Sequence, residues 1–183
     1  MLILGIDPGL RITGYGAVRF AGRSVALVEA GVIRTPDQGG LASRLHELAG
    51  GLRQVIAALG PDAVVVESLY SHYKHPRTSI LMGHARGLAL LAAAELGVPV
   101  FEYPATRIKK SLTGNGRAAK DQMQRTIAST LGLARPPEPP DVADALAAAL
   151  CHANVIRHEI RGIHHEGTKK KKTQVRSGLR ISP

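Results

Sequence analysis

The sequence predicts an α/β fold built on one mixed five-stranded sheet with helices on both faces. Two observations predict it. Three strand-like stretches joined by short turns come first, which is typical of an antiparallel unit. Helical stretches then alternate with two short apolar strands, which is typical of crossover connections. The chain has 183 residues, a length that favours a single domain with a substantial core.

Turn sequences define the antiparallel unit. An apolar strand over residues 2–6 ends at Asp7-Pro8-Gly9, a sequence that favours a turn. Two further strands are expected over residues 13–20 and 24–34, with the hairpin signal Ala21-Gly22-Arg23 between them. Together these strands predict a three-stranded antiparallel unit.

The alternating part begins with a helix over residues 41–59, where apolar side chains recur at helical spacing. Residues 63–66 are apolar on both faces and predict a buried strand, which a crossover places parallel to the first strand. A helix over residues 78–96 and a fifth strand over residues 98–103 follow.

Three helical stretches complete the chain. Two are expected over residues 107–110 and 120–133, on either side of a turn that contains two glycines. The last runs from residue 141 to about residue 156. We expect residues 158–183 to form a basic, disordered tail. The predicted organisation is therefore one domain over residues 1–157, followed by this tail.

Composition narrows the class of protein. The apolar content of 44% excludes a mainly disordered chain. The single cysteine, Cys151, excludes a disulfide framework and a cysteine-based zinc site, and it favours a reducing compartment. No signal peptide and no membrane span are apparent, so we expect a cytoplasmic protein without a membrane partner.

The chain is basic, with a formal net charge of +10. The excess is shared between the two predicted parts, because residues 158–183 hold seven basic and two acidic side chains. The predicted domain is thus itself basic. This pattern favours a polyanionic partner such as nucleic acid.

Four carboxylates lie at unusual positions. Asp7 and Glu67 each end an apolar strand, and Asp141 and Asp144 lie three residues apart on one helix face. If that helix packs where the two strands end, all four meet. Like charges at close range raise one another's pKa, and a pair of divalent cations removes this conflict. Oxygen-only ligands suit Mg²⁺ or Mn²⁺, and two such ions are typical of phosphodiester hydrolysis.

Each of these acids also has a plain structural explanation. Asp7 fits a turn, and Glu67 fits a charged strand end. Asp141 fits a helix N-cap, and Asp144 fits the stabilisation of the helix dipole. That the four acids meet at one site is therefore a hypothesis, which depends on how the last helix packs against the two strands. Acids at the centre of a basic protein are the charge arrangement that a nuclease needs, because the surface attracts the DNA backbone and the centre holds the metals.

Several short motifs carry a resemblance to a known family. They are Gly5-Ile6-Asp7-Pro8-Gly9, Thr13-Gly14-Tyr15-Gly16, Glu67 after its apolar strand, His84-Ala85-Arg86-Gly87, Phe101-Glu102-Tyr103 and Asp141-Val142-Ala143-Asp144-Ala145-Leu146-Ala147. In this order and spacing, over residues 2 to about 156, the chain resembles the RuvC-type Holliday-junction resolvases.

The resemblance implies an RNase H-like fold and a homodimer that makes paired, Mg²⁺-dependent nicks in four-way DNA junctions during homologous recombination and repair. The products would carry 5′-phosphate and 3′-OH ends. It implies partnership with the RuvA and RuvB branch-migration proteins. It also assigns catalysis and metal binding to Asp7, Glu67, Asp141 and Asp144, with Mn²⁺ as a substitute for Mg²⁺.

Five further residues are candidates for DNA contact. The resemblance places Tyr70 where an aromatic ring stacks on an unpaired base, and it places Lys109 and Lys120 at phosphate contacts. Lys74 and Arg77, in the polar loop before the helix over residues 78–96, are candidates from their charge. That helix, rich in Leu and Ala, is the candidate dimer contact.

Three other functions compete with a junction resolvase. The opening motif also occurs in actin-like kinases and ATPases, but those need two domains and a second phosphate loop, for which this chain has neither the length nor the sequence. A nuclease of the same fold acting on RNA or on an RNA–DNA hybrid stays open. A non-catalytic DNA-binding module is the third alternative.

Overall fold

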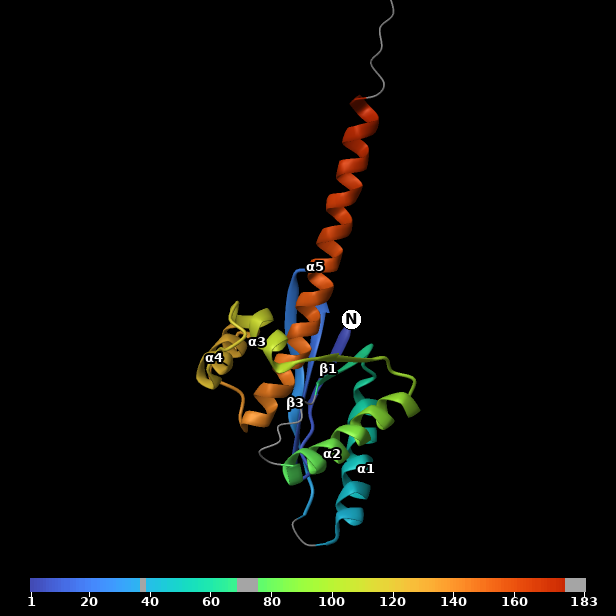
Figure 1. Ribbon diagram of the computed structural model, residues 1–183, viewed down its shortest axis with the longest axis vertical. Helices are drawn as coiled ribbons and strands as arrows, with labels where there is room; N and C mark the ends of the chain where they lie inside the picture. The colour runs from blue at the N-terminus through green and yellow to red at the C-terminus, as the bar shows by residue number, and fades with distance from the viewer. Residues whose placement is uncertain (37–38, 69–75, 177–183) are drawn as a thin grey trace, which may run out of the picture.

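The five predicted strands form one mixed sheet (Figure 1). The structure is a computed structural model that describes the backbone of residues 1–36, 39–68 and 76–176; within these ranges the side chains of 76–77 and 161–176 are not described. The strands are β1 (Leu2–Asp7), β2 (Ile12–Ala21), β3 (Ser24–Arg34), β4 (Ala63–Glu67) and β5 (Val100–Tyr103). Their order is β3-β2-β1-β4-β5. The first three are antiparallel, and β4 and β5 continue the sheet in parallel with β1.

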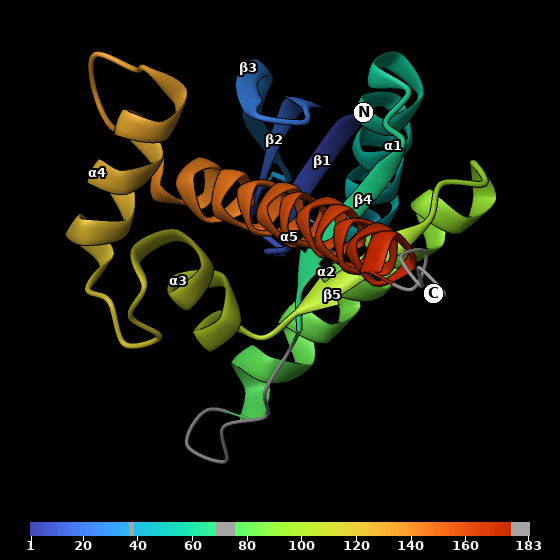
Figure 2. The same cartoon turned by 90° about the horizontal axis from the view of Figure 1, so that it is seen from above.

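Helices cover both faces of this sheet, as the sequence predicts. They are α1 (Leu41–Leu59), α2 (Pro76–Glu95), α3 (Ala105–Thr113), α4 (Lys120–Leu131) and α5 (Pro140–Arg176). One core lies under α5, α3 and α4, and the other lies under α1 and α2. Figure 2 shows α3 and α4 together beside α5, away from α1 and α2. Among the described residues, no helix is long and apolar enough to cross a membrane.

The central strand β1 is buried on both faces. Ile3 belongs to the core under α5, whereas Leu4 and Ile6 belong to the core under α1 and α2. This division follows from the alternation of side chains along a strand. An unbroken apolar run therefore leads directly to Asp7, where the strand leaves the sheet.

Two glycines bring α5 unusually close to the sheet. A Cβ atom on Gly5 would overlap the carbonyl oxygen of Ala145, and one on Gly14 would overlap the carbonyl oxygen of Asp141. Real Cβ atoms essentially never approach other atoms so closely. The backbone of α5 therefore rests on β1 and β2 at a distance that only glycine permits.

Most element boundaries lie within two residues of the predictions. The strand expected over residues 98–103 begins at Val100, because Pro99 has no N–H group for the ladder. The short helix expected over residues 107–110 extends over Ala105–Thr113 and ends at Gly114, which is left-handed with φ +77°.

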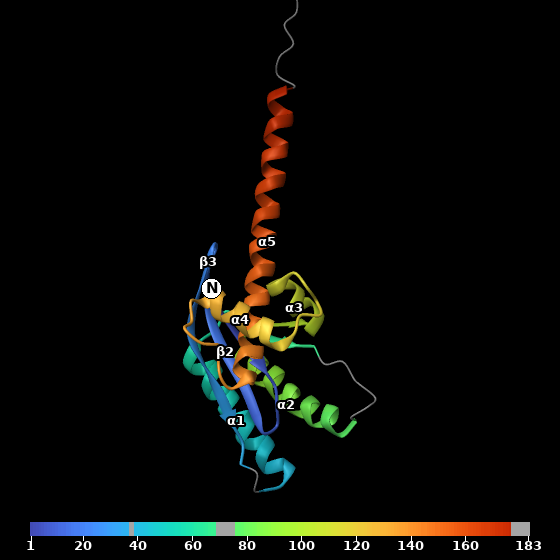
Figure 3. The ribbon, with the colours of Figure 1, turned by 90° about the vertical axis from the view of Figure 1, so that its left-hand side faces the viewer.

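The largest difference is in α5, which continues to Arg176 rather than ending near residue 156 (Figures 1 and 3). No proline interrupts the sequence between Asp141 and Arg176, and lysine and arginine are good helix formers. The helix therefore runs through much of the segment expected as a disordered tail. Residues 177–183 lie outside the described residues.

Candidate metal centre

Asp7 and Glu67 lie at the same edge of the sheet. Ile6 is paired with Val66 in the parallel ladder between β1 and β4, so the next residue of each strand is an acid. Both carboxylates therefore leave the sheet side by side, at the carboxyl ends of neighbouring strands. This is the arrangement that the sequence analysis requires for a shared site.

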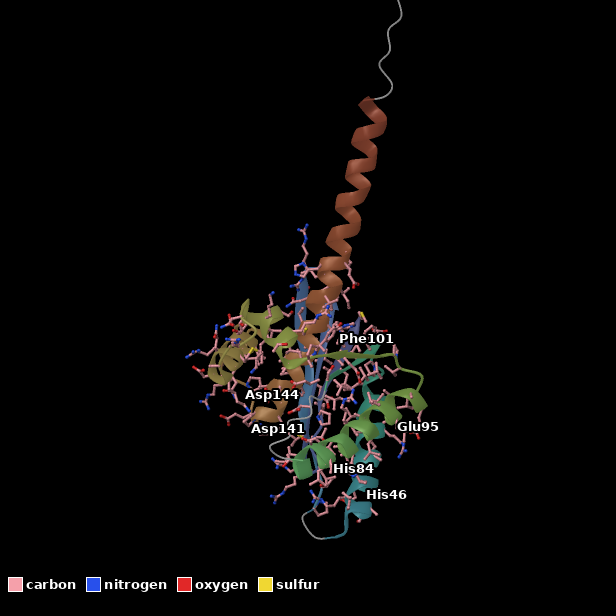
Figure 4. All side chains as sticks on the ribbon, in the orientation of Figure 1. His46, His84, Glu95, Phe101, Asp141 and Asp144 are labelled. Carbon is pink, nitrogen blue, oxygen red and sulfur yellow. The ribbon has the colours of Figure 1, made fainter. Side chains whose placement is uncertain are left out.

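The other two acids reach this edge from α5. Asp141 and Asp144 lie one turn apart near the start of the helix (Figure 4). Gly14, which is paired with Asp7 across β1 and β2, is also the residue that the backbone of Asp141 contacts. The close approach at this glycine therefore holds the start of α5 over the end of β1.

The four carboxylates interact electrostatically. The pKa of Asp7 is raised to about 7, mainly by burial and then by the charges of Asp144, Asp141 and Glu67, in that order, while Lys120 opposes them. The pKa of Glu67 is also raised, mainly because the side chain is partly removed from water and secondly because of the charge of Asp144. The structure thus brings together the four acids that the sequence singled out.

Lys109 and Lys120 lie beside these acids. A pocket of about 270 Å³ is lined by Glu67, Ala105, Ile108, Lys109, Lys120, Met123, Asp144 and Ala147. The Nζ atom of Lys120 is 3.4 Å from Oδ2 of Asp144, and Lys109 lowers the pKa of Glu67. Since both lysine side chains reach the acidic edge, a phosphate group held there would meet cations as well as carboxylates.

Arg86 is a site residue to which the sequence analysis gave no role. It lines a small cavity of about 20 Å³ together with Asp7, Pro8, Glu67 and Met82. Its guanidinium forms an ion pair with Glu102 of β5, and its Nε atom is buried without a hydrogen-bond partner. The sequence does carry a signal for this role. Arg86 lies in the middle of a mainly apolar helix, and an acid, Glu102, follows on the next strand.

Three of the predicted DNA contacts belong to residues or side chains outside the described part of the chain. Tyr70 and Lys74 lie outside the described residues, and the side chain of Arg77, near the start of α2, does so as well. Their assigned contacts with DNA stay predictions.

The donor set of the acidic edge suits a hard divalent cation. In the part of the chain that the structure describes, no three His, Cys, Asp or Glu side chains lie close enough together to hold a metal ion as they stand. The four acids nevertheless offer only oxygen ligands, and a nearby cation favours the ionised form that their mutual repulsion disfavours. The residues present therefore fit Mg²⁺ or Mn²⁺.

Comparisons with known proteins agree with this fold. Residues 3–152 match the family described as "Crossover junction endodeoxyribonuclease RuvC". A relative of that name from Rhodopirellula baltica is 52% identical over 149 residues, which cover 81% of this chain and 84% of the relative.

Solved structures give the same result. A structure of Thermus thermophilus RuvC has a TM-score of 0.80 and 34% identity, covering 87% of this chain and 97% of that one. T. thermophilus RuvC in complex with a Holliday junction substrate has a TM-score of 0.77 and 32% identity, with coverage of 86% and 96%. The RNase H-like fold expected from the motifs is thereby confirmed, and the chain belongs to the RuvC family of crossover junction endodeoxyribonucleases.

Proposed function

We propose that this protein resolves four-way DNA junctions by hydrolysing a phosphodiester bond in each of two strands. The observation that carries the proposal is the convergence of Asp7, Glu67, Asp141 and Asp144 at one edge of the sheet, in a chain of this family. A relative of known structure was solved with a Holliday junction as its substrate. Loss of any of these acids would have favoured a non-catalytic DNA-binding module instead.

These four residues would hold the metal, with Mg²⁺ as the expected ion, Mn²⁺ as a substitute and two ions per site. Divalent cations bound there supply Lewis-acid polarisation of the phosphodiester and lower the pKa of a bound water. Lys109 and Lys120 bind and orient the phosphate beside the carboxylates. Water adds to phosphorus as the bond to the 3′ oxygen breaks, which leaves 5′-phosphate and 3′-OH ends.

A homodimer fits this function, because a four-way junction has twofold pseudosymmetry and needs two like nicks. Ile80 and Leu91 support α2 as the contact. They are 60% and 48% exposed, and at eleven residues apart they lie on the same side of the helix. The partnership with RuvA and RuvB and the cytoplasmic location rest on the family resemblance and the sequence, and both stay predictions.

The function is tested with a labelled four-way junction in Mg²⁺, in Mn²⁺ or in EDTA, with a linear duplex and an RNA–DNA hybrid as competing substrates. We expect symmetric, metal-dependent nicks in the junction alone. Preferential cleavage of the hybrid would show that the substrate is an RNA–DNA hybrid, hydrolysed at the same acidic site. Tight binding of the junction without nicks in either metal would show that the protein is a non-catalytic DNA-binding module.

Metal-free protein should lose stability as the pH rises from about 4 to about 7. The carboxyl of Asp7 has its pKa raised from 3.8 to about 7, so the folded state binds the proton more tightly than the unfolded state in this window. Asp7→Asn removes the cost of ionising this group. Its free energy of unfolding should match that of the parent near pH 4 and exceed it by about 2–4 kcal/mol at pH 8.

Urea titrations in EDTA at pH 4 to 8 measure this difference. Asp121→Asn is the control, since Asp121 is exposed and paired with Arg125 on α4. A difference between Asp7→Asn and the parent that stays constant with pH would contradict the assignment of the raised pKa to Asp7.

A further inference from the structure

A second basic surface lies on α3, beside a groove that none of the four acids of the metal centre lines. The groove has a volume of about 460 Å³ and lies between α3 and α5. It is lined by Arg107, Lys110, Ser111, Val155, His158 and Glu159. Lys109 lies between two of these cations in the sequence but lines the acidic pocket instead. The helix α3 therefore presents basic side chains in two directions.

The walls of this groove are fixed by hydrogen bonds. Nδ2 of Asn154 donates to the carbonyl oxygen and to Oγ of Ser111, each at 3.2 Å, and so ties α5 to α3. Arg157 in turn donates from Nη1 to Oδ1 of Asn154 at 3.0 Å. The guanidinium carbon of Arg107 lies 4.7 Å from the centre of the Tyr103 ring. A guanidinium stacked on a ring keeps N–H groups at its edge for a further partner.

The cations of the groove are not neutralised by ion pairs. Within the described residues, neither Arg107 nor Lys110 forms a salt bridge, whereas Arg53 and Arg125 each have a carboxylate partner. Glu159 is the carboxylate that lines the groove. The local excess of positive charge favours a phosphate ligand.

We propose that this groove binds backbone phosphates of a duplex arm of the junction, at a distance from the bond that is cut. The proposal rests on the proposed function. Between Asp144 and His158 the helix rises by about 21 Å, at about 1.5 Å per residue, which corresponds to about six base-pair steps of 3.4 Å. One duplex arm is therefore long enough to contact the acidic edge and the groove together. Binding there holds the arm without taking part in hydrolysis.

The charges of the groove are tested with the double variant Arg107→Gln, Lys110→Gln and a fluorescent four-way junction in EDTA. We expect about tenfold weaker binding at 0.1 M salt and a slope of log K against log salt that is smaller by about 1–2, as for the loss of two phosphate contacts. The control is Arg19→Gln, Arg53→Gln, which removes the same charge from β2 and α1. Its salt slope should equal that of the parent.

A third variant tests the proposal in the opposite direction. Glu159→Gln removes the carboxylate from the groove and should tighten junction binding, a gain that structural damage would not produce. The double variant could fail to fold because it loses the contact between Arg107 and Tyr103. In that case Lys110→Gln alone replaces it, and this single variant should lower the slope of log K against log salt by about 1.

Two results would overturn the proposal. One is a salt slope of the double variant equal to that of its control, and the other is no gain in affinity from Glu159→Gln. Nicking of the junction in Mg²⁺ is measured separately at saturating protein, where the groove variants should match the parent. A parent protein that makes no nicks would refute the proposed function, whereas the salt slopes test the groove.

Discussion

Asp7→Asn should reduce the rate of junction cleavage at least about 10³-fold while leaving junction affinity within about twofold of the parent value. The substitution removes an anionic ligand worth several kcal/mol of transition-state stabilisation, at about 1.4 kcal/mol for each factor of ten. It removes no cation, so the attraction of Lys109 and Lys120 for phosphate is preserved or increased. Single-turnover cleavage and equilibrium binding on the same labelled junction measure the two effects separately.

The matched control for this prediction is Asp121→Asn, which makes the same chemical change at an exposed position on α4. It should cleave at the parent rate. A variant Asp7→Asn that loses binding together with cleavage would contradict a metal-ligand role, because it would place this carboxylate in the folding of the DNA-contacting surface instead.

Gly14→Ala should reduce cleavage about 10²-fold in a folded protein that still binds the junction. The added Cβ atom would overlap the carbonyl oxygen of Asp141, so the start of α5 must move away from β2. Asp141 and Asp144 then move relative to Asp7, and a displacement of about 1 Å in a catalytic constellation costs about this factor. The variant should also need more Mg²⁺ for half-maximal rate, an effect that loss of stability alone would not produce.

Gly50→Ala is the control for this change, because nothing lies within 4 Å of a Cβ atom at this position in α1. It should keep the parent rate and raise the free energy of unfolding by about 0.5–1 kcal/mol, since alanine favours a helix interior over glycine. Parent-like activity and metal dependence of Gly14→Ala would show that α5 adapts to the added atom. The close contact would then play no part in placing the acids.

The sequence predicted the strand ends of the acidic edge well because local patterns determine them. The apolar runs before Asp7 and Glu67 define two buried strands, and a crossover connection makes such strands parallel. Parallel neighbours end at the same edge, so proximity of the two acids followed from topology. The order of elements and the two-sided cover of helices followed from the same periodicities.

Other features depend on packing that a single sequence does not encode locally. The sequence shows Gly14 only as part of a motif, because its role depends on a helix more than a hundred residues later. The position of Arg86 beside Asp7 and Glu67 depends on how α2 lies against the sheet. Predicting the groove between α3 and α5 would require the orientation of both helices, which the sequence does not give. Helix α5 continues past the end expected near residue 156, because no proline stops it and its lysine and arginine residues favour a helix.

Binding of Mn²⁺ is the measurement that tests most directly whether these four acids form a metal centre. Free Mn²⁺ would be followed by electron paramagnetic resonance during titration of the parent protein, of Asp7→Asn, Glu67→Gln, Asp141→Asn and Asp144→Asn, and of the exposed control Asp121→Asn. We expect up to two ions per chain in the parent and the control, and loss of an ion or at least about tenfold weaker binding in each of the four variants. Equal binding by all six proteins would contradict the account, because the convergence of these carboxylates would then have no part in holding a metal.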